Sequence, residues 1–249
     1  AFLDQLVPQA KEYLKGAGGL RRLLTPSYHL QFSEALANFA MHKARVIVEE
    51  HQGDLIYAGG DDVLAVLPAM RAVACARALR DAFKVDFADG RMYPGGECEV
   101  SCGIAVGHQN APLQMLVKEA QKAEKSAKRE YGRAALAIAL YKRSGEIIEW
   151  GCKWESGALD LMAEITRLTA AEKLSGRFPY ALSGLLQPYA LEQTMPEALE
   201  AMLPVVQAEV RHVLSRQGVS LSGGEREALA TAMDRYLETC WRSAPASGV

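Results

Sequence analysis

The segment LIYAGGDDVLAVLP, residues 55–68, places two glycines and two adjacent aspartates between two short apolar runs. Such runs on either side of a glycine- and aspartate-rich break are typical of two β-strands joined by a tight turn. We therefore expect a hairpin with strands near residues 54–58 and 63–67. Because both runs are nearly continuous in apolar residues, we also expect both faces of the hairpin to be covered.

The spacing of apolar residues predicts helices on both sides of this hairpin and further strands beyond it. Residues 98–108, CEVSCGIAVGH, alternate as a strand, and one face of that strand carries only small residues: Ser101, Gly103, Ala105 and Gly107. A face this small lets a helix or a ligand approach the backbone. The other predicted elements are helices over residues 1–20, 25–53, 72–83 and 112–131, and a strand, a turn and a second strand over residues 133–150.

This order of elements is that of a split βαβ, ferredoxin-like sheet with helices on one face. Such a sheet normally opens with a central strand before its first helix, whereas this chain starts within a predicted helix. We therefore expect the missing strand to lie upstream of Ala1 and the chain to be a fragment of a longer protein. The predicted fold class is α+β, with the ferredoxin-like domain over residues 1–152.

The second part of the chain has a different pattern. From about residue 156 onward strands disappear, and helical spacing covers residues 159–174, 196–217 and 223–241. We expect a separate all-α domain over residues 153–249, with a frayed tail at residues 243–249.

The composition is that of a soluble globular protein, with 49% hydrophobic and 23% charged residues among 249. A net charge of -2 gives no general electrostatic case for binding nucleic acid or a membrane. The five cysteines lack the paired spacing of a zinc site, so we expect them to be ordinary core or strand residues in a reducing compartment. No apolar run is long enough to span a membrane, and the expected location is the cytoplasm.

The adjacent carboxylates Asp61 and Asp62 have a specific chemical use. Two such groups bind hard divalent cations such as Mg²⁺, and the glycines leave room for a triphosphate to approach the backbone. Two metal ions can then activate an attacking hydroxyl and stabilise the pyrophosphate that leaves. The alternative is a plain hairpin turn, which also favours glycine and aspartate. A turn needs only one aspartate, so the second favours a metal site.

Two further motifs have both a functional and a structural interpretation. Lys128, near the end of the predicted helix over residues 112–131, could reach a phosphate, but spacing alone favours a solvated helix face. The run VSLSGGERE, residues 219–227, resembles the signature loop of ABC-type ATPases, yet the chain has no Walker A loop. We interpret Ser222 and Glu225 as a helix capping box.

Taken together, the pieces TPSYHLQFSEALANFA, VEEHQGDLIYAGGDDVLAVLP, SCGIAVGH and AEKSAKREYGRAALAIALYKRSGE resemble one family. They are similar to the second palm domain of the large subunit of type III CRISPR effector complexes, closest to the type III-B branch. The helical remainder, including RFPYALSGLL, resembles the C-terminal helical domain of that subunit.

This resemblance implies an enzyme that is activated by target RNA and converts ATP into cyclic oligoadenylates. Asp61 and Asp62 would then be the catalytic residues and would hold two Mg²⁺ or Mn²⁺ ions. Nucleotide contacts would come from Gly59, Gly60, Ser101 and Lys128. The implied partners are the other subunits of an RNA-guided complex, its guide and target RNAs, and ATP, without a membrane.

Two other functions stay open. In the first, the chain is a structural or interaction module of the same complex, and the GGDD segment is only a turn. In the second, it is a diguanylate cyclase-like signalling enzyme, although those enzymes usually have GG[DE]EF where this chain has Val63 and Leu64 after the aspartates.

Overall fold

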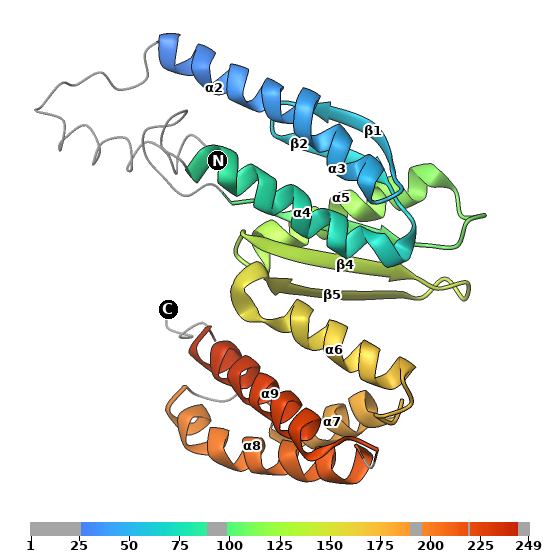
Figure 1. Ribbon diagram of the computed structural model, residues 1–249, viewed down its shortest axis with the longest axis vertical. Coiled ribbons are helices and arrows are strands. Elements are labelled where there is room, and N and C mark those ends of the chain that lie inside the picture. Colours follow the sequence, from blue (N-terminus) through green and yellow to red (C-terminus); the bar gives the residue numbers. More distant parts are fainter. Residues whose placement is uncertain (1–25, 89–98, 190–195, 219, 244–249) are drawn as a thin grey trace, which may run out of the picture. The chain divides into compact units, whose positions relative to one another are not determined.

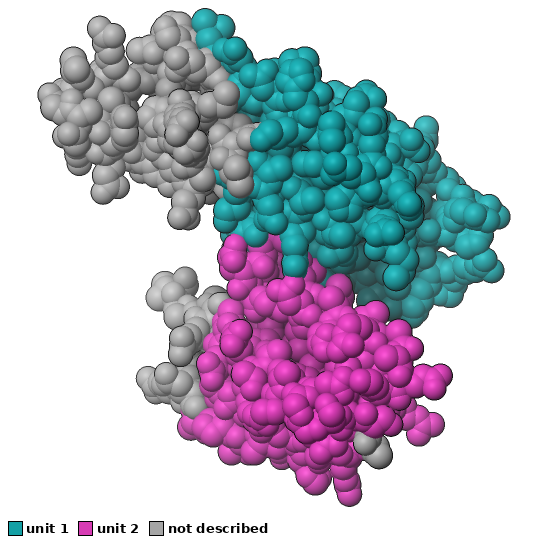
Figure 2. All heavy atoms as spheres, viewed as in Figure 1, with its two compact units in different colours: residues 1–151 teal, residues 152–249 magenta. Residues whose placement is uncertain are grey.

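The computed structural model of the chain describes residues 26–88, 99–189, 196–218 and 220–243. The chain divides into two compact units, residues 1–151 and 152–249, which Figure 2 shows in different colours. The helix predicted over residues 1–20 and the end of the predicted tail lie outside the described residues.

The first unit combines helices with two small sheets (Figure 1). This confirms the predicted α+β class and the order of a hairpin, a helix, a strand, a helix and two strands. The long helix predicted before the hairpin is continuous and contains one π-helical turn, η1. The elements in chain order are α2 (Pro26–Asn38), η1 (Phe39–Ala44), α3 (Arg45–Glu50), β1 (Asp54–Gly59), β2 (Asp62–Val66), α4 (Ala69–Ala88), β3 (Cys102–Val106), α5 (Leu113–Arg129), β4 (Ala135–Tyr141) and β5 (Ile147–Lys153).

Hydrogen bonding groups the described strands into two sheets. β1 pairs antiparallel with β2, and β3 pairs parallel with β4, which has β5 on its other side. The parallel pair is connected through α5, as a β-strand–helix–β-strand crossover requires. The turn between β4 and β5 lies where predicted, with Gly145 in the left-handed conformation at φ +85°.

Helices pack against both faces of β3, and the expectation of helices on one face was wrong. Val100, just before β3, packs against the core cluster that contains Phe39 of η1 and Phe83 of α4. The Phe39 and Phe83 rings meet edge to face, with centroids 5.2 Å apart. On the opposite face, a Cβ on Gly103 would collide with the backbone of α5 at Ala120 and Glu124. The small-residue face of β3 therefore serves close helix packing, one of the two uses predicted for it.

The hairpin is covered less completely than its apolar sequence predicted. Ala58 packs against the core cluster that contains Phe39 and Phe83, so one face meets helices. Ile56 and Tyr57 are nevertheless 58% and 55% exposed. The expectation of two covered faces was therefore wrong within the described part of the chain, because the helices described there reach the hairpin through the Ala58 face.

A buried ion pair ties α4 to the residue that leads into β3. The Arg80 guanidinium donates to both carboxylate oxygens of Glu99, over 3.0 Å from Nε and 2.8 Å from Nη2. Lys84 donates to the same carboxylate over 2.5 Å. This two-pronged pairing satisfies a guanidinium that is otherwise enclosed by the core.

The second unit is helical, as predicted. Its core is a cluster of buried aliphatic side chains with Phe178 and Met233. Its elements are η2 (Trp154–Ser156), α6 (Ala158–Ala170), α7 (Phe178–Leu186), η3 (Gln187–Tyr189), α8 (Pro196–Gln217) and α9 (Gly223–Ser243).

Two local features of this unit relate to the sequence motifs. The helix α7 lies outside the helical ranges predicted for this unit. Its Pro179 lies in the first turn, where a proline is tolerated. The capping box is confirmed: Ser222 donates from its backbone N–H and its hydroxyl to Glu225 over 3.0 and 2.9 Å, and the Glu225 N–H donates back to the Ser222 hydroxyl over 3.3 Å.

Candidate metal and nucleotide-binding site

The tip of the β1–β2 hairpin is a two-residue loop. Gly59 and Asp62 are the last paired residues, so Gly60 and Asp61 form the connection. Gly60 has the left-handed φ of +60°, and Asp61 is not among the residues with positive φ. Glycine at the first of two loop positions, with φ positive there alone, is the pattern of a type II′ turn. Gly60 and Asp61 are therefore the residues that form the hairpin turn predicted from the sequence.

Asp62 is a strand residue rather than a turn residue. The register pairs it with Gly59 and pairs Leu64 with Tyr57, so these residues share one face of the hairpin. Ala58 points to the opposite face and packs on the helices. The Asp62 carboxylate is exposed, as is that of Asp61 beside it. The turn thus presents two adjacent, exposed carboxylates at the end of the hairpin.

These two carboxylates fit a hard cation that shares its remaining ligands with water and substrate. Mg²⁺ is usually held by one or two carboxylates together with substrate phosphates, and it keeps several waters. Among the residues that the structure describes, no group of three or more His, Cys, Asp or Glu side chains could hold a metal ion. The donor set at the tip therefore suits a metal–nucleotide complex better than a permanently bound structural metal.

The two glycines before the aspartates have different surroundings. A Cβ on Gly60 would meet nothing within 4 Å, so the backbone there is open to a phosphate. A Cβ on Gly59 would lie 2.5 Å from the Tyr57 hydroxyl and 2.8 Å from the ring carbon that carries it. The Tyr57 phenol therefore occupies the space over Gly59, which sequence reasoning had assigned to the triphosphate.

Ser101 lies immediately before β3, next to a residue that packs against the same core cluster as the hairpin. Ala58, next to Gly59, and Val100, next to Ser101, both pack against the cluster of Phe39 and Phe83. Since side chains alternate along an extended segment, Ser101 points away from that cluster, as Asp62 does on the hairpin.

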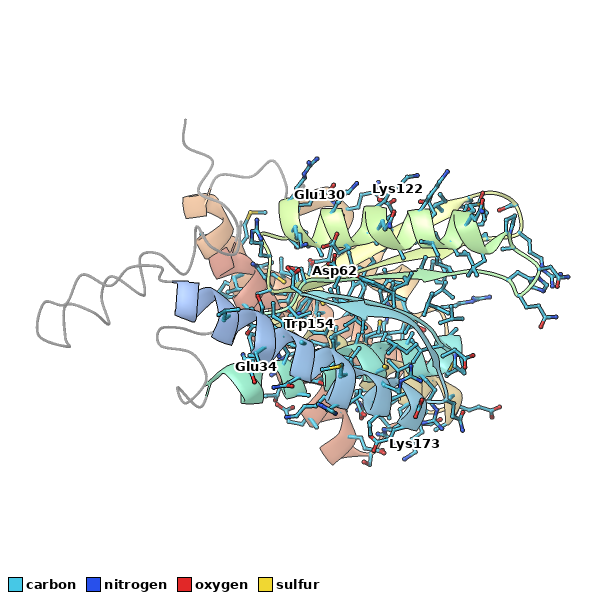
Figure 3. The ribbon with its side chains drawn as sticks, turned by 90° about the horizontal axis from the view of Figure 1, so that it is seen from above. Glu34, Asp62, Lys122, Glu130, Trp154 and Lys173 are labelled. Atoms are coloured by element: carbon cyan, nitrogen blue, oxygen red, sulfur yellow. The ribbon has the colours of Figure 1, made fainter. Side chains whose placement is uncertain are left out.

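Lys128 lies in the last turn of α5, and the packing of α5 on β3 shows where that turn lies. A Cβ on Gly107 would meet Leu116, and one on Gly103 would meet Glu124, so α5 runs antiparallel to β3. Because the two elements run in opposite directions, the last turn of α5 lies beside Ser101, which precedes Gly103 by two residues. In Figure 3 the labelled Asp62 and Glu130, the residue just after α5, both lie toward the same side of the unit.

The Lys128 ammonium is not an isolated charge in this structure. It forms an ion pair with Glu124, one turn earlier in α5, and its side chain is 41% exposed. This pairing draws the ammonium back along the helix, away from the C-terminal end. Binding of a phosphate by Lys128 would require the ammonium to exchange Glu124 for the phosphate.

The thiols of Cys75 in α4 and Cys102 in β3 are poor candidates for chemistry. Burial raises the pKa of Cys102 to about 12, and the neighbouring Cys75 and Glu124 add to this effect. Burial also raises the pKa of Cys75. A thiol is reactive as its thiolate, so both side chains stay protonated and inert at neutral pH. This agrees with their predicted role as core residues.

Sequence reasoning overlooked two residues of this region. Tyr57 precedes Gly59 by two positions in a strand, and strand alternation alone would have placed both on one face. Glu124 precedes Lys128 by four positions in a helix, the spacing at which a carboxylate and an ammonium meet. Both signals were local and present in the sequence.

Comparisons with known proteins identify the family. The model of the second palm domain of Cas10/Cmr2 matches residues 4–137. The Cmr subunit Cmr2 of the CRISPR system of Pyrococcus furiosus is 36% identical over 177 residues, 70% of this chain and 19% of the relative. The corresponding subunit of Saccharolobus solfataricus is 38% identical over 63 residues, 25% of this chain and 6% of the relative. The chain thus spans a fifth or less of the length of these relatives.

Within the described helices, none is both long and apolar enough to cross a bilayer. The family match covers more than half of the chain, including the hairpin, β3 and α5. It confirms the resemblance to the large subunit of type III CRISPR complexes in its type III-B branch. The chain belongs to the Cas10/Cmr2 family, and its first unit contains that family's second palm domain.

Proposed function

We propose that this chain carries the nucleotidyltransferase site with which a type III CRISPR complex makes cyclic oligoadenylates from ATP in the cytoplasm. The observation that carries the proposal is the pair of exposed, adjacent carboxylates, Asp61 and Asp62, at a tight hairpin tip whose Gly60 backbone is open. Membership of the Cas10/Cmr2 family supports a palm-type chemistry at this tip.

The proposed reaction needs no protein nucleophile. The 3′-oxygen of one nucleotide bonds to the α-phosphorus of the next, the α–β phosphate bridge breaks, and pyrophosphate leaves with its bonding electrons. The proton of the 3′-hydroxyl passes to water. Mg²⁺ or Mn²⁺ held by Asp61 and Asp62 would supply activation of the hydroxyl and neutralise charge on the leaving group. Repetition and ring closure by the same step give the cyclic product.

The protein's own contribution is to position the nucleotide and balance its charge. The open backbone at Gly60 would admit the triphosphate, and we propose that Ser101, just before β3, and Lys128, in the last turn of α5, contact the nucleotide. A preorganised arrangement of this kind accelerates phosphoryl transfer mainly through orientation and electrostatics. We propose that guide and target RNA act through the other subunits of the complex and switch this site on.

The proposal is tested with the assembled complex. With ATP, Mg²⁺ and matching target RNA, the complex should form cyclic oligoadenylates, and a complex with Asp61→Ala and Asp62→Ala should not. Equal product from both complexes would refute the assignment. A type II′ turn is also compatible with a hairpin that has only a structural role. In that case neither the wild-type complex nor the Asp61→Ala/Asp62→Ala complex should form a nucleotide product. GTP-derived cyclic dinucleotides would instead indicate a diguanylate cyclase-like enzyme.

A further inference from the structure

The Tyr57 side chain has no evident packing role, although it lies at the candidate site. It is 55% exposed and belongs to the hairpin face opposite Ala58, which is the residue that packs on the helices. Its ring leans along β1, so that the hydroxyl lies 2.5 Å from the position of a Cβ on Gly59. The tip of the ring, with its hydroxyl, therefore covers Gly59 while the side chain stays largely in solvent, where the hydroxyl can reach a ligand.

The register places this phenol beside a metal-binding carboxylate of the proposed site. Gly59 and Asp62 are directly paired, and side chains of paired residues start about 5 Å apart on the same face. Since the Tyr57 hydroxyl occupies the side-chain position of Gly59, it lies on the same face of the hairpin as the Asp62 side chain and at the same pair of residues. A ligand that contacts a metal ion on Asp62 is therefore within reach of the hydroxyl.

We infer that Tyr57 is a nucleotide-binding residue, whose hydroxyl donates a hydrogen bond to a phosphate oxygen of the metal-bound ATP. The inference rests on the proposed nucleotide site at Asp61 and Asp62. It also gives the two glycines separate roles: Gly60 leaves the backbone open, and Gly59 makes room for the phenol. The alternative is that the ring only shields the Gly59 backbone, which needs no hydroxyl.

Tyr57→Phe separates these two roles, because it keeps the ring over Gly59 and removes only the hydroxyl. We expect calorimetry of the full chain with Mn²⁺ and ATP to show about tenfold weaker ATP binding, the loss typical of a hydrogen bond to a charged group. Mn²⁺ binding without nucleotide, followed by electron paramagnetic resonance, should be unchanged. The matched control Tyr180→Phe, at a 79% exposed tyrosine in α7, should bind ATP like the wild type.

Each result bears on the inference. Wild-type ATP affinity in Tyr57→Phe, with binding abolished in Asp61→Ala/Asp62→Ala, would overturn the role of Tyr57 and leave the proposed function standing. Weaker Mn²⁺ binding without nucleotide in Tyr57→Phe would overturn a phosphate contact, because the hydroxyl would then act through Asp62. If the wild type shows no metal-dependent ATP binding, both the inference and the proposed site are wrong.

Discussion

Gly59 faces Asp62 across the hairpin as the last residue pair before the turn. The sequence left open whether this segment is only a tight turn or also a metal site. Gly60 and Asp61 form the turn. Asp62 is therefore the first residue of β2, and its carboxylate is exposed. The two interpretations are therefore compatible, and Asp62 is available for metal binding without a cost to the turn.

Lys128 should contribute to ATP binding once it leaves Glu124. Replacing Lys128 by alanine removes a cation from the phosphates, and we expect about tenfold weaker binding of Mg²⁺-ATP in calorimetry. Glu124→Gln removes the competing carboxylate, and because exposed pairs of this spacing are weak we expect about twofold tighter binding.

Lys125→Ala is the matched control for Lys128, since Lys125 is an exposed lysine of the same helix. Its ATP affinity should equal that of the wild type. If Lys125→Ala and Lys128→Ala weaken binding equally, the contribution is a general effect of helix charge and not a phosphate contact by Lys128.

Gly103→Ala should destabilise the first unit. The added Cβ would collide with the backbone of α5 at Ala120 and Glu124, which cannot move aside as a flexible side chain could. Forcing extra volume into such a contact costs about 1–3 kcal/mol in the free energy of unfolding, measurable by urea denaturation of the full chain. It should also weaken ATP binding, because α5 carries Lys128.

The control for this change is Gly184→Ala in α7, where a Cβ meets nothing within 4 Å. Alanine is the better helix former, so its unfolding free energy should stay the same or rise by up to about 1 kcal/mol. Wild-type stability in Gly103→Ala would show that β3 and α5 are not in backbone contact.

The second unit should lose stability in acid through Glu225. Hydrogen bonds from Lys173 and from the Ser222 backbone and hydroxyl lower the pKa of Glu225 to about 2 from its ordinary 4.5. A carboxyl with a lowered pKa stabilises the folded state above pH 4.5, and this contribution is lost as the pH falls from about 4.5 to 2. Thermal unfolding of Glu225→Gln should therefore show a smaller decrease in Tm over this range than the wild type.

Glu238→Gln, at an exposed glutamate of the same helix, should retain the wild-type decrease. Ser222→Ala removes the N-cap and should lower the unfolding free energy by about 1 kcal/mol at pH 7. Identical pH profiles for Glu225→Gln and the wild type would contradict the role of the Lys173–Ser222–Glu225 cluster.

Local patterns predicted much of this fold, because local physics determines those features. Glycine at a two-residue turn, apolar spacing along α5 and the Ser222–Glu225 capping box each specify structure within a few residues of the chain. The helix α7 was overlooked because it contains Pro179. Proline breaks the interior of a helix, but Pro179 lies in the first turn, where proline is accepted.

Features that depend on distant parts of the chain were predicted less well. The small face of β3 was compatible with either a helix or a ligand, and only packing shows that α5 covers it at Gly103. The apolar hairpin strands suggested two covered faces, although Tyr57 is exposed. At the site, the sequence predicted which residue types could bind metal and phosphate, but not that the phenol of Tyr57 lies over Gly59.

The central claim is that Asp61 and Asp62 bind ATP through a divalent cation. Calorimetry of the full chain with ATP, with and without Mn²⁺, tests this claim most directly. The variant is Asp61→Ala/Asp62→Ala. The control is Asp54→Ala, because Asp54 is an exposed aspartate at the other end of the same hairpin. We predict that the wild type and Asp54→Ala bind ATP only with the metal, and that the double variant shows no metal-dependent binding. Equal metal-dependent binding by all three proteins would contradict the account.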